Sequence, residues 1–417
     1  MTRHRPISDP GGSTPGDRLW LRWVVAVLAA ASIGFVAYGT WSAWTRRSDI
    51  DTQGREDEYA LFRMGVYPNA HIETPPPPSG RVYTVYPPYT LPMFAVFFEP
   101  GGALQARILI QVLSLASLVV MGAFAYRTLA PYGESVALLG AVAGAAMAGN
   151  ATALMVGQFS IICVGLIVLQ LLCLERQRPL AAGACWALAM IKPQIALPFG
   201  VLFMFRGQVV GGLFGAAILG VLSLAACAWT EVSFLRILRH WLGEMSFEFA
   251  TRENGIGPGR LATVLGIDPR IAQLITLGML AAIMVPVGWF MRRLDRRALV
   301  PVAGLCSVAG MFFAYHRFYD NVMLFPALLA LIAFAAESGR LFPMVVAGLM
   351  IARLLMPQRI FDYVPWHGML QSGLWVAAGM LPLRMAVGPP AGLQDSRAVA
   401  GGDPAATEDS SQSANRV

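Results

Sequence analysis

Long apolar stretches dominate the sequence and decide what the chain can fold into. A helix needs about 20 apolar residues to cross the ~30 Å hydrocarbon layer of a bilayer. Of the 417 residues, 56% are hydrophobic and 13% are charged, about half the charged fraction of a soluble domain. We therefore predict an all-α polytopic membrane protein. The expected spans are residues 19–44, 103–126, 134–155, 158–174, 209–229, 270–291, 299–315, 320–337, 341–356 and 367–387.

Two further apolar stretches are interrupted by proline. Residues 86–100 (YPPYTLPMFAVFFEP) form a short proline-rich stretch, and residues 179–207 break at Lys192-Pro193 into halves too short to span. Proline removes a backbone donor, and the carbonyls it frees must be satisfied by protein or water. Both stretches are expected to be re-entrant or discontinuous elements that line a cavity. Together with the ten expected spans, these stretches give a prediction of about 10–13 transmembrane or re-entrant helices.

The two ends of the chain are polar and enclose one predicted transmembrane domain. Residues 1–18 and 388–417 consist mainly of small and polar residues, which favours disorder. The first apolar stretch is too long for the core of a signal peptide, so it is expected to stay as an anchor. The prediction is a disordered cytoplasmic N-terminus at 1–18, a transmembrane domain at 19–387 and a disordered cytoplasmic tail at 388–417.

The arginines set the expected orientation. With a cytoplasmic N-terminus, the strongest basic cluster, RRLDRR at 292–297, lies inside, as the positive-inside rule requires. The opposite face also keeps many arginines, which we interpret as cationic groups for anionic ligands. Polar groups at membrane depth usually mark a site, so the active face is predicted to be extracytoplasmic. Its expected features are residues 49–58, 86–89, 157–158, 192–193, 253–260 and 315–320.

Several function classes lack support in the sequence. The formal net charge of +7 suits a membrane protein with cytoplasmic arginines, so no nucleic-acid partner is expected. No phosphate-binding loop or dinucleotide fingerprint is present, which makes a cytosolic nucleotide-sugar donor less favoured. The five cysteines lie in apolar segments without metal-ligand spacing, so packed free thiols are expected. No cofactor is assigned, and a requirement for a divalent metal is left open.

A series of short motifs resembles family 87 of the GT-C superfamily of integral-membrane glycosyltransferases. An acid follows the first span, and then come Y-A-x(4)-G-x-Y from Tyr59 and YPP from Tyr86. Further along are GQ at 157–158, AG at 182–183, KPQ at 192–194 and H-x(3)-D from His316. Each motif alone is common, so their order and spacing carry the resemblance.

The resemblance implies a GT-C fold over the transmembrane domain and hexosyl transfer from a polyprenyl-phosphate sugar to a lipid or glycan acceptor. Mannose is the expected sugar, with arabinose as the alternative. The family uses an aspartate of the first outer loop as general base. Asp51, fourteen residues before Gly65, matches best, and Asp49 is second. The tyrosine that usually follows the aspartate is replaced here by the sequence Gln53-Gly54-Arg55.

The remaining candidates follow from the chemistry of the donor. A departing phosphate needs cationic groups, and the candidates for donor or phosphate binding are Lys192, His316, Arg317 and Arg260. The candidates for lining the cavity are Tyr86, Pro87, Gln158 and Asp320. Lys192 is the only lysine of the chain.

Each candidate also has a purely structural interpretation. The acids at 49–51 could pair with nearby arginines, and those at 56–58 could form a solvated helix start. Lys192 could extend its ammonium to the membrane interface. Gln158 could cap a helix, and His316 could pair with Asp320.

Two other classes of membrane protein remain as alternatives. A transporter or flippase of lipid-linked glycans also uses broken helices and intramembrane cations. An O-antigen-ligase-like enzyme or an acyltransferase is the second alternative.

Overall fold

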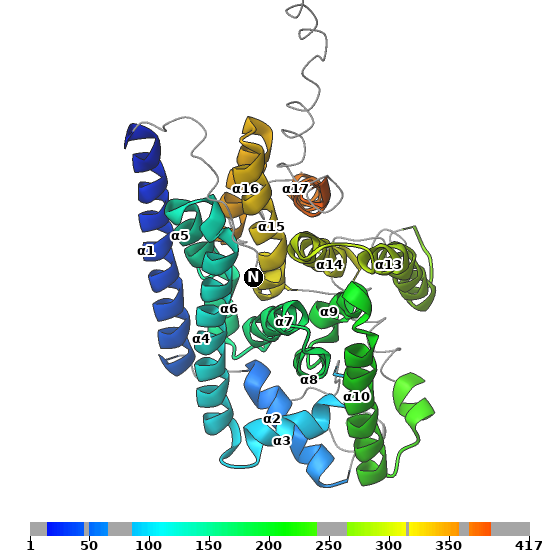
Figure 1. Cartoon of the computed structure of the whole chain (residues 1–417). Coiled ribbons are helices and arrows are strands. Elements are labelled where there is room, and N and C mark those ends of the chain that lie inside the picture. The colour runs from blue at the N-terminus through cyan, green and yellow to red at the C-terminus, as the bar shows by residue number, and fades with distance from the viewer. Residues whose placement is uncertain are drawn as a thin grey trace, which may run out of the picture. The chain divides into compact units, whose positions relative to one another are not determined.

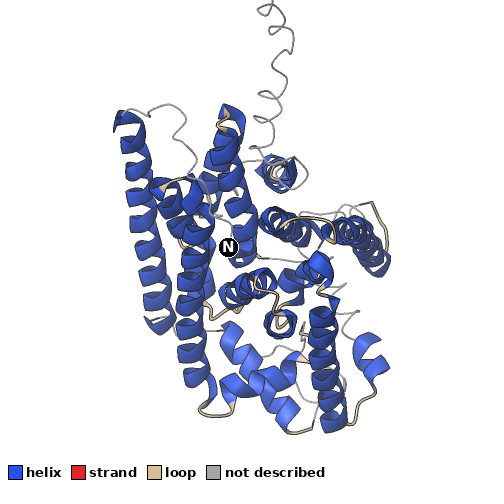
Figure 2. Cartoon of the chain, viewed as in Figure 1, coloured by secondary structure: helices blue, strands red, loops and turns tan. Residues whose placement is uncertain are grey.

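The computed structural model describes residues 15–45, 50–65, 86–239, 265–313, 317–357 and 367–384. Within these ranges the chain consists of helices and short loops and contains no strand (Figure 2). The prediction of an all-α polytopic protein is therefore confirmed. The predicted disordered ends, apart from residues 15–18, lie outside the described residues.

The helices follow one another in the order shown in Figure 1. The first half contains α1 (Pro15–Thr45), α2 (Ile50–Arg63), α3 (Thr90–Phe98), α4 (Gly102–Leu129), η1 (Ala130–Tyr132), α5 (Glu134–Ala143), α6 (Ala148–Met155), α7 (Ser160–Glu175) and α8 (Pro179–Ala189). The second half contains α9 (Pro193–Ala196), η2 (Leu197–Gly207), α10 (Val209–Thr230), α13 (Pro269–Met291), η3 (Arg296–Ala298), α14 (Leu299–Phe313), η4 (Phe318–Leu324), α15 (Phe325–Ser338), α16 (Leu341–Leu355) and α17 (His367–Met380).

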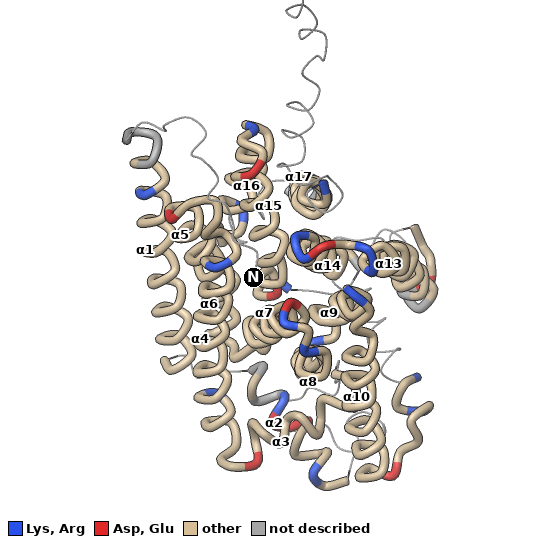
Figure 3. Tube along the Cα trace, viewed as in Figure 1, with Lys and Arg blue, Asp and Glu red and all other residues tan. Residues whose placement is uncertain are grey.

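Six helical segments in the described part are long and apolar enough to cross a membrane: Leu19–Thr45, Gly102–Tyr132, Glu134–Met155, Val209–Thr230, Leu274–Met291 and Phe318–Ser338. Charged residues lie mostly toward helix ends and in the α2–α3 region, as Figure 3 shows. Shorter apolar helices occur at Ser160–Glu175, Pro179–Ala189 and Leu341–Leu355. Some of the ten predicted spans are therefore shorter than a full crossing.

Two predicted spans are each divided into two elements. The stretch 134–155 forms α5 and α6, because the amide of Asn150 donates to the carbonyls of Gly144 (2.9 Å) and Ala145 (3.2 Å) and replaces helical partners there. Asparagine side chains compete for backbone groups in this way. The stretch 320–337 begins as the 3₁₀ helix η4 before it becomes α15.

The first helix faces away from the rest of the chain along much of its length. Trp20 and Trp23 are exposed near one end, and Trp41 and Trp44 near the other. The two pairs are separated by 21 positions, or about 32 Å at 1.5 Å per residue. That distance matches the hydrocarbon layer of a bilayer, whose two interfaces favour tryptophan.

The break predicted at Lys192-Pro193 is confirmed, since α8 ends at Ala189 and α9 begins at Pro193. Close backbone contact fixes α8 against α10. A Cβ atom on Gly183 would lie 2.1 Å from the carbonyl oxygen of Gly211, and one on Gly215 would lie 2.8 Å from that of Gly183. Glycine at these positions lets the two helices touch, a common arrangement in membrane proteins.

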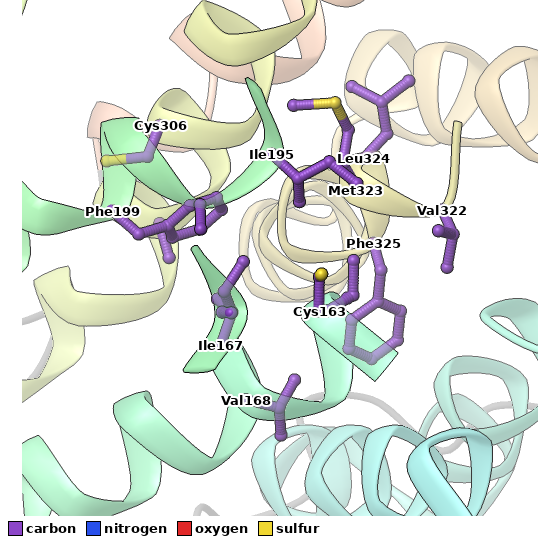
Figure 4. Packing of buried hydrophobic residues seen from close by; sticks show 14 of the residues in the cluster. Cys163, Ile167, Val168, Ile195, Phe199, Cys306, Val322, Met323, Leu324 and Phe325 are labelled. Carbon is purple, nitrogen blue, oxygen red and sulfur yellow. The ribbon is translucent and has the colours of Figure 1, made fainter. Parts of the chain in front are cut away.

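The hydrophobic core surrounds α7, α14 and α15. Figure 4 shows Cys163 and Ile167 of α7 among Ile195 of α9, Cys306 of α14 and Phe325 of α15. The five cysteines are free thiols, with Cys163 and Cys306 buried and the others half-buried, as predicted. This core lies directly next to the polar residues described below.

Candidate functional site

The acids that follow the first span belong to helix α2. Asp51 lies in the first turn of this helix, although its side chain is outside the described residues, as is the whole of Asp49. Thr52, Arg55, Tyr59 and Phe62 are buried, and their spacing of three, four and three residues is that of one helix face. Helix α2 is therefore amphipathic and packs its buried face against the transmembrane helices.

Helix α2 is attached to the α3–α4 connection by polar contacts. Oε1 of Glu56 accepts a hydrogen bond from the backbone N–H of Ala103 at 2.9 Å, in the first turn of α4. A carboxylate is favoured at the N-terminus of a helix, where backbone donors are unpaired. The interpretation of Glu56 as part of a solvated helix start is therefore wrong, because this residue lies inside α2 and binds another helix.

The far end of α2 is held by Glu99. The hydroxyl of Tyr59 donates to Oε1 of Glu99 at 2.6 Å, and Nε of Arg63 lies 3.1 Å from the same oxygen. Burial and the neighbouring carboxylate raise the pKa of Tyr59 well above its usual value. The phenol therefore stays neutral and remains the donor in this contact.

Arg55 is the most deeply placed charged residue of α2 among those whose side chains are described, with 2% of its surface exposed. Its guanidinium donates to the carbonyl oxygen of Gly157, to the hydroxyl of Thr52 at 3.3 Å and to that of Tyr86 at 3.4 Å. The group also lies 5.0 Å from the centre of the Phe159 ring. We call these five residues the Arg55 cluster.

The GQFS segment, residues 157–160, connects α6 to α7. Gly157 has φ of +63°, a left-handed conformation that favours glycine. The N–H of Gln158 donates to the carbonyl of Ala153 at 2.8 Å, and its side chain is buried. The Phe159 ring packs edge-on against Phe97, with ring centres 4.9 Å apart. The segment is a tight turn fixed by packing on both sides.

The YPP residues lie at the same place. Tyr86 belongs to the Arg55 cluster and packs edge-on against Phe94, with ring centres 5.1 Å apart. Pro87 is buried, and its carbonyl accepts hydrogen bonds from the N–H (3.0 Å) and the hydroxyl (2.6 Å) of Thr90. These contacts start helix α3 and hold Tyr86 against Arg55.

Lys192 forms a second buried polar cluster. Its Nζ atom lies 2.7 Å from Oδ1 of Asp320 and 2.9 Å from the Ser160 hydroxyl, which itself donates to Oδ1 of Asp320 at 2.5 Å. Lys192 is 3% exposed, Asp320 1% and Ser160 0%. Lys192 immediately precedes α9, Asp320 lies in η4 and Ser160 begins α7, so one ion pair connects three parts of the chain.

Asp320 also organises the residues after position 316. Its Oδ2 accepts a hydrogen bond from the backbone N–H of Arg317 at 2.9 Å, which caps η4. The Tyr319 ring lies 4.7 Å from Nζ of Lys192 and 5.9 Å from the Arg317 guanidinium. Two of the predicted donor-binding cations therefore flank one aromatic ring. We call Lys192, Ser160, Asp320, Arg317 and Tyr319 the Lys192 cluster.

The two clusters meet at the GQFS segment, because Gly157 and Phe159 contact Arg55 while Ser160 contacts Lys192 and Asp320. The structure thus brings together the segments that contain most of the predicted site residues. Residues 253–260 with Arg260, and also His316, lie outside the described residues. Within the described part, no group of three His, Cys, Asp or Glu side chains is arranged to hold a metal ion.

Several members of the two clusters were not predicted as site residues, and Arg55 and Ser160 are the two whose polar contacts connect the clusters to the GQFS segment. Arg55 was considered as a possible partner of the acids and as one of the many arginines of the outer face, although it follows Asp51 by one helical turn on the face that carries Tyr59 and Phe62. Its place in that pattern was a usable signal. Ser160 gave none, because a serine at a helix start is most simply read as a local cap.

The comparisons with known proteins place the chain in a family. The model of glycosyltransferase family 87 matches residues 83–318, more than half of the chain. This range includes Tyr86, the GQFS segment, Lys192 and Arg317, whereas Asp51 lies before it and Asp320 two residues after it. Comparisons with curated proteins and with solved structures each gave no match. From the extent of the family match and its membrane-type helical fold, the chain belongs to glycosyltransferase family 87.

Proposed function

We propose that this membrane glycosyltransferase moves a sugar, with mannose as the first candidate, from a polyprenyl-phosphate donor to a lipid or glycan acceptor. The observation that carries the proposal is the meeting of the Arg55 and Lys192 clusters at the GQFS segment, beside the helix that contains Asp51. Buried cations within a membrane enzyme suit a substrate with a phosphate on a lipid. A donor embedded in the bilayer also fits the long apolar helices.

The proposed step needs one base and one leaving group. The acceptor hydroxyl oxygen attacks the anomeric carbon while Asp51 takes the hydroxyl proton. The bond between the anomeric carbon and the phosphate oxygen breaks, and its electron pair leaves with polyprenyl phosphate. The products are a glycoside of inverted configuration and a phosphate with one more negative charge. A well-placed base contributes about 10²–10⁴-fold to such a step.

The growing charge on the phosphate requires cations near the leaving oxygen. We propose Lys192, Arg317, His316 and Arg260 for this role. Lys192 and Arg317 both lie beside the Tyr319 ring, which supports a shared position for these two. An ammonium has three donors, and the hydrogen bonds of Lys192 to Ser160 and Asp320 use two of them. Preorganised cations of this kind stabilise the transition state because they need no rearrangement during the reaction.

The proposed active face is extracytoplasmic, with both termini in the cytoplasm of a bacterium and the protein in its plasma membrane. Helix α2 follows α1, which has the length of one membrane crossing, so α2 lies at the side opposite to the N-terminus. The polar helix α2 and the residues around Tyr86 are then in contact with water and with an acceptor.

The base is tested by substituting the acids of α2 one at a time in purified protein in nanodiscs. Polyprenyl-phosphate mannose, or the arabinose analogue, is supplied with membrane glycolipid acceptors, and labelled product is counted. Asp51→Asn and Asp49→Asn are compared with Asp57→Asn. Asp57 is the sharpest rival, because its Oδ2 is buried without a hydrogen-bond partner.

The proposal expects at least about a 100-fold loss of transfer in Asp51→Asn and wild-type transfer in Asp57→Asn. Loss in Asp57→Asn or Asp49→Asn alone would assign the base to that residue instead. If the same protein in closed lipid vesicles moved the labelled lipid across the bilayer without a new glycosidic bond, the proposal would be replaced by a flippase.

A further inference from the structure

We infer that Arg55 is a positioning residue for the transfer reaction: it sets the place of the Asp51-bearing helix relative to the Lys192 cluster. The inference rests on the proposed function, because it takes Asp51 as the base. It assigns to Arg55 a role that lies outside the acids and the donor-binding cations named so far.

The contacts of Arg55 connect α2 to two segments that are distant from it in the sequence. The guanidinium joins α2 to the carbonyl of Gly157, 102 positions away, and to the hydroxyl of Tyr86, 31 positions away. Arginine is suited to this because its planar fork presents five donors in fixed directions. One side chain thereby fixes both the rotation of α2 and its distance from the GQFS segment.

The burial of Arg55 argues that this linkage has a function. Removing a guanidinium from water is costly, and a buried charge is retained only where hydrogen bonds compensate for it. Arg63, eight residues later on the same helix, has 58% of its side chain exposed and pairs with a half-exposed Glu99. Attachment of α2 to its neighbours therefore does not require a buried arginine, and Arg55 does more than attach the helix.

Arg55 is close to the predicted base along the helix. Asp51 precedes it by one turn of α2, a rise of about 6 Å along the axis. On its other side Arg55 touches Gly157 and Phe159, and the next residue, Ser160, binds Lys192 and Asp320. The route from base to donor-binding cations thus runs through Arg55 and the four residues of the GQFS segment.

A positioning role of Arg55 and a direct role in donor binding have different kinetic effects. A displacement of about 1 Å between reacting groups lowers a rate by about 100-fold, without a matching loss of substrate affinity. Removal of a group that binds the donor phosphate equally well before and during the reaction raises the donor KM instead. The kcat and the donor KM therefore report the two roles separately.

The test uses full-length protein in nanodiscs with Arg55→Met, Arg55→Lys and the matched control Arg63→Met. We expect Arg55→Met to lower kcat by about 100-fold with less than about a threefold change in donor KM. Arg55→Lys keeps a cation that can reach Gly157 and is expected to recover part of kcat. Arg63→Met is expected to keep both constants near those of wild type.

A second measurement is independent of activity. Hydrogen exchange of the α2 peptide, residues 50–63, is expected to be faster in Arg55→Met than in wild type or Arg63→Met, with unchanged exchange in α7. A donor KM raised about tenfold at constant kcat, or unchanged exchange in α2, would overturn the inference. Full activity of Asp51→Asn would contradict the role of Asp51 as base. If Arg55→Met still lowered kcat and still made hydrogen exchange in α2 faster, Arg55 would remain a positioning residue for the reaction.

Discussion

Lys192 and Arg55 are both buried cations that hydrogen-bond to the GQFS segment, yet they are held in different ways. Lys192 pairs with a carboxylate at 2.7 Å, and Ser160 completes a compact group that connects α7, α9 and η4. Arg55 spreads its contacts over a carbonyl, two hydroxyls and an aromatic ring, and connects the polar helix α2 to that interior.

The difference follows from the chemistry of the two side chains. An ammonium is a compact, strongly hydrated charge, so it needs an anion when it is buried. A guanidinium is planar and more weakly hydrated, and it can be satisfied by several neutral acceptors at fixed angles. We accordingly expect substitutions in the Lys192 cluster to change mainly the stability of the fold. Substitutions in the Arg55 cluster are expected to change mainly the position of α2.

The largest expected effect tests the stability side of this comparison. Lys192→Met or Asp320→Leu leaves one buried charge without its partner, which destabilises a protein by about 3–5 kcal/mol. The double variant removes both charges and is expected to unfold closer to wild type than either single variant. Thermal unfolding in detergent, arranged as a double-mutant cycle, measures the coupling. Additive losses would show that the pair is not the source of the stability.

A smaller effect is expected at the helix contact that places Lys192. In Gly183→Ala the added methyl would lie 2.1 Å from the backbone oxygen of Gly211, so α8 and α10 must separate. Overpacking of this kind costs about 1–3 kcal/mol. Gly220→Ala, also in α10, adds a methyl into open space and is the control. Equal unfolding temperatures of the two variants would contradict the close contact.

The geometry side of the comparison is tested at Gly157. Its φ of +63° costs a residue with a side chain about 1–2 kcal/mol, so Gly157→Ala is expected to lose this much stability. Because the Gly157 carbonyl is a partner of Arg55, kcat is expected to fall as well. Gly157→Asn serves as the control, since asparagine tolerates this conformation better. A stable, fully active Gly157→Ala would separate Arg55 from the turn.

The smallest effect is expected at the exposed end of α2. Glu99→Gln removes the charge that faces Arg63 and keeps an oxygen that can accept from Tyr59. Exposed ion pairs contribute about 0–1 kcal/mol, so the free energy of unfolding should change by no more than this. The same difference measured in high salt should be smaller still. A larger loss would mean that Glu99, rather than Arg55, anchors the helix.

The bounds of helices were predictable from the sequence where the thickness of the bilayer determines the length of the apolar segment. The bounds predicted for the spans at 209–229 and 270–291 differ by a single residue at one end from α10 and α13. The span predicted at 134–155 has the bounds of one of the helical segments long and apolar enough to cross a membrane. Its division into α5 and α6 at the hydrogen bonds of the Asn150 side chain was not predicted. Hydropathy indicates whether a segment lies in lipid or in water. It carries no information about a single side chain that hydrogen-bonds to backbone carbonyls in place of the helical partners.

The site was predictable in its segments and not in its contacts. Lys192 attracted attention as a single lysine beside a proline break, but its partner Asp320 is 128 residues away and no local pattern connects them. The sequence suggested a pairing of Asp320 with His316, because residues one helical turn apart are the natural candidates. Arg55 could have been found from its place in the amphipathic pattern of α2. Which partners a buried polar group finds is decided by tertiary packing.

One consequence concerns the short link between α1 and α2. Only residues 46–49 separate a helix whose tryptophans mark two membrane interfaces from the helix that contains Asp51. A transmembrane helix tilts when the lipid acyl chains become shorter, and so brief a tether has little slack to absorb the tilt. The position of the helix that contains Asp51 is therefore expected to depend on the thickness of the host membrane. Rates measured in detergent and in lipids of different chain length would then come from different positions of this helix.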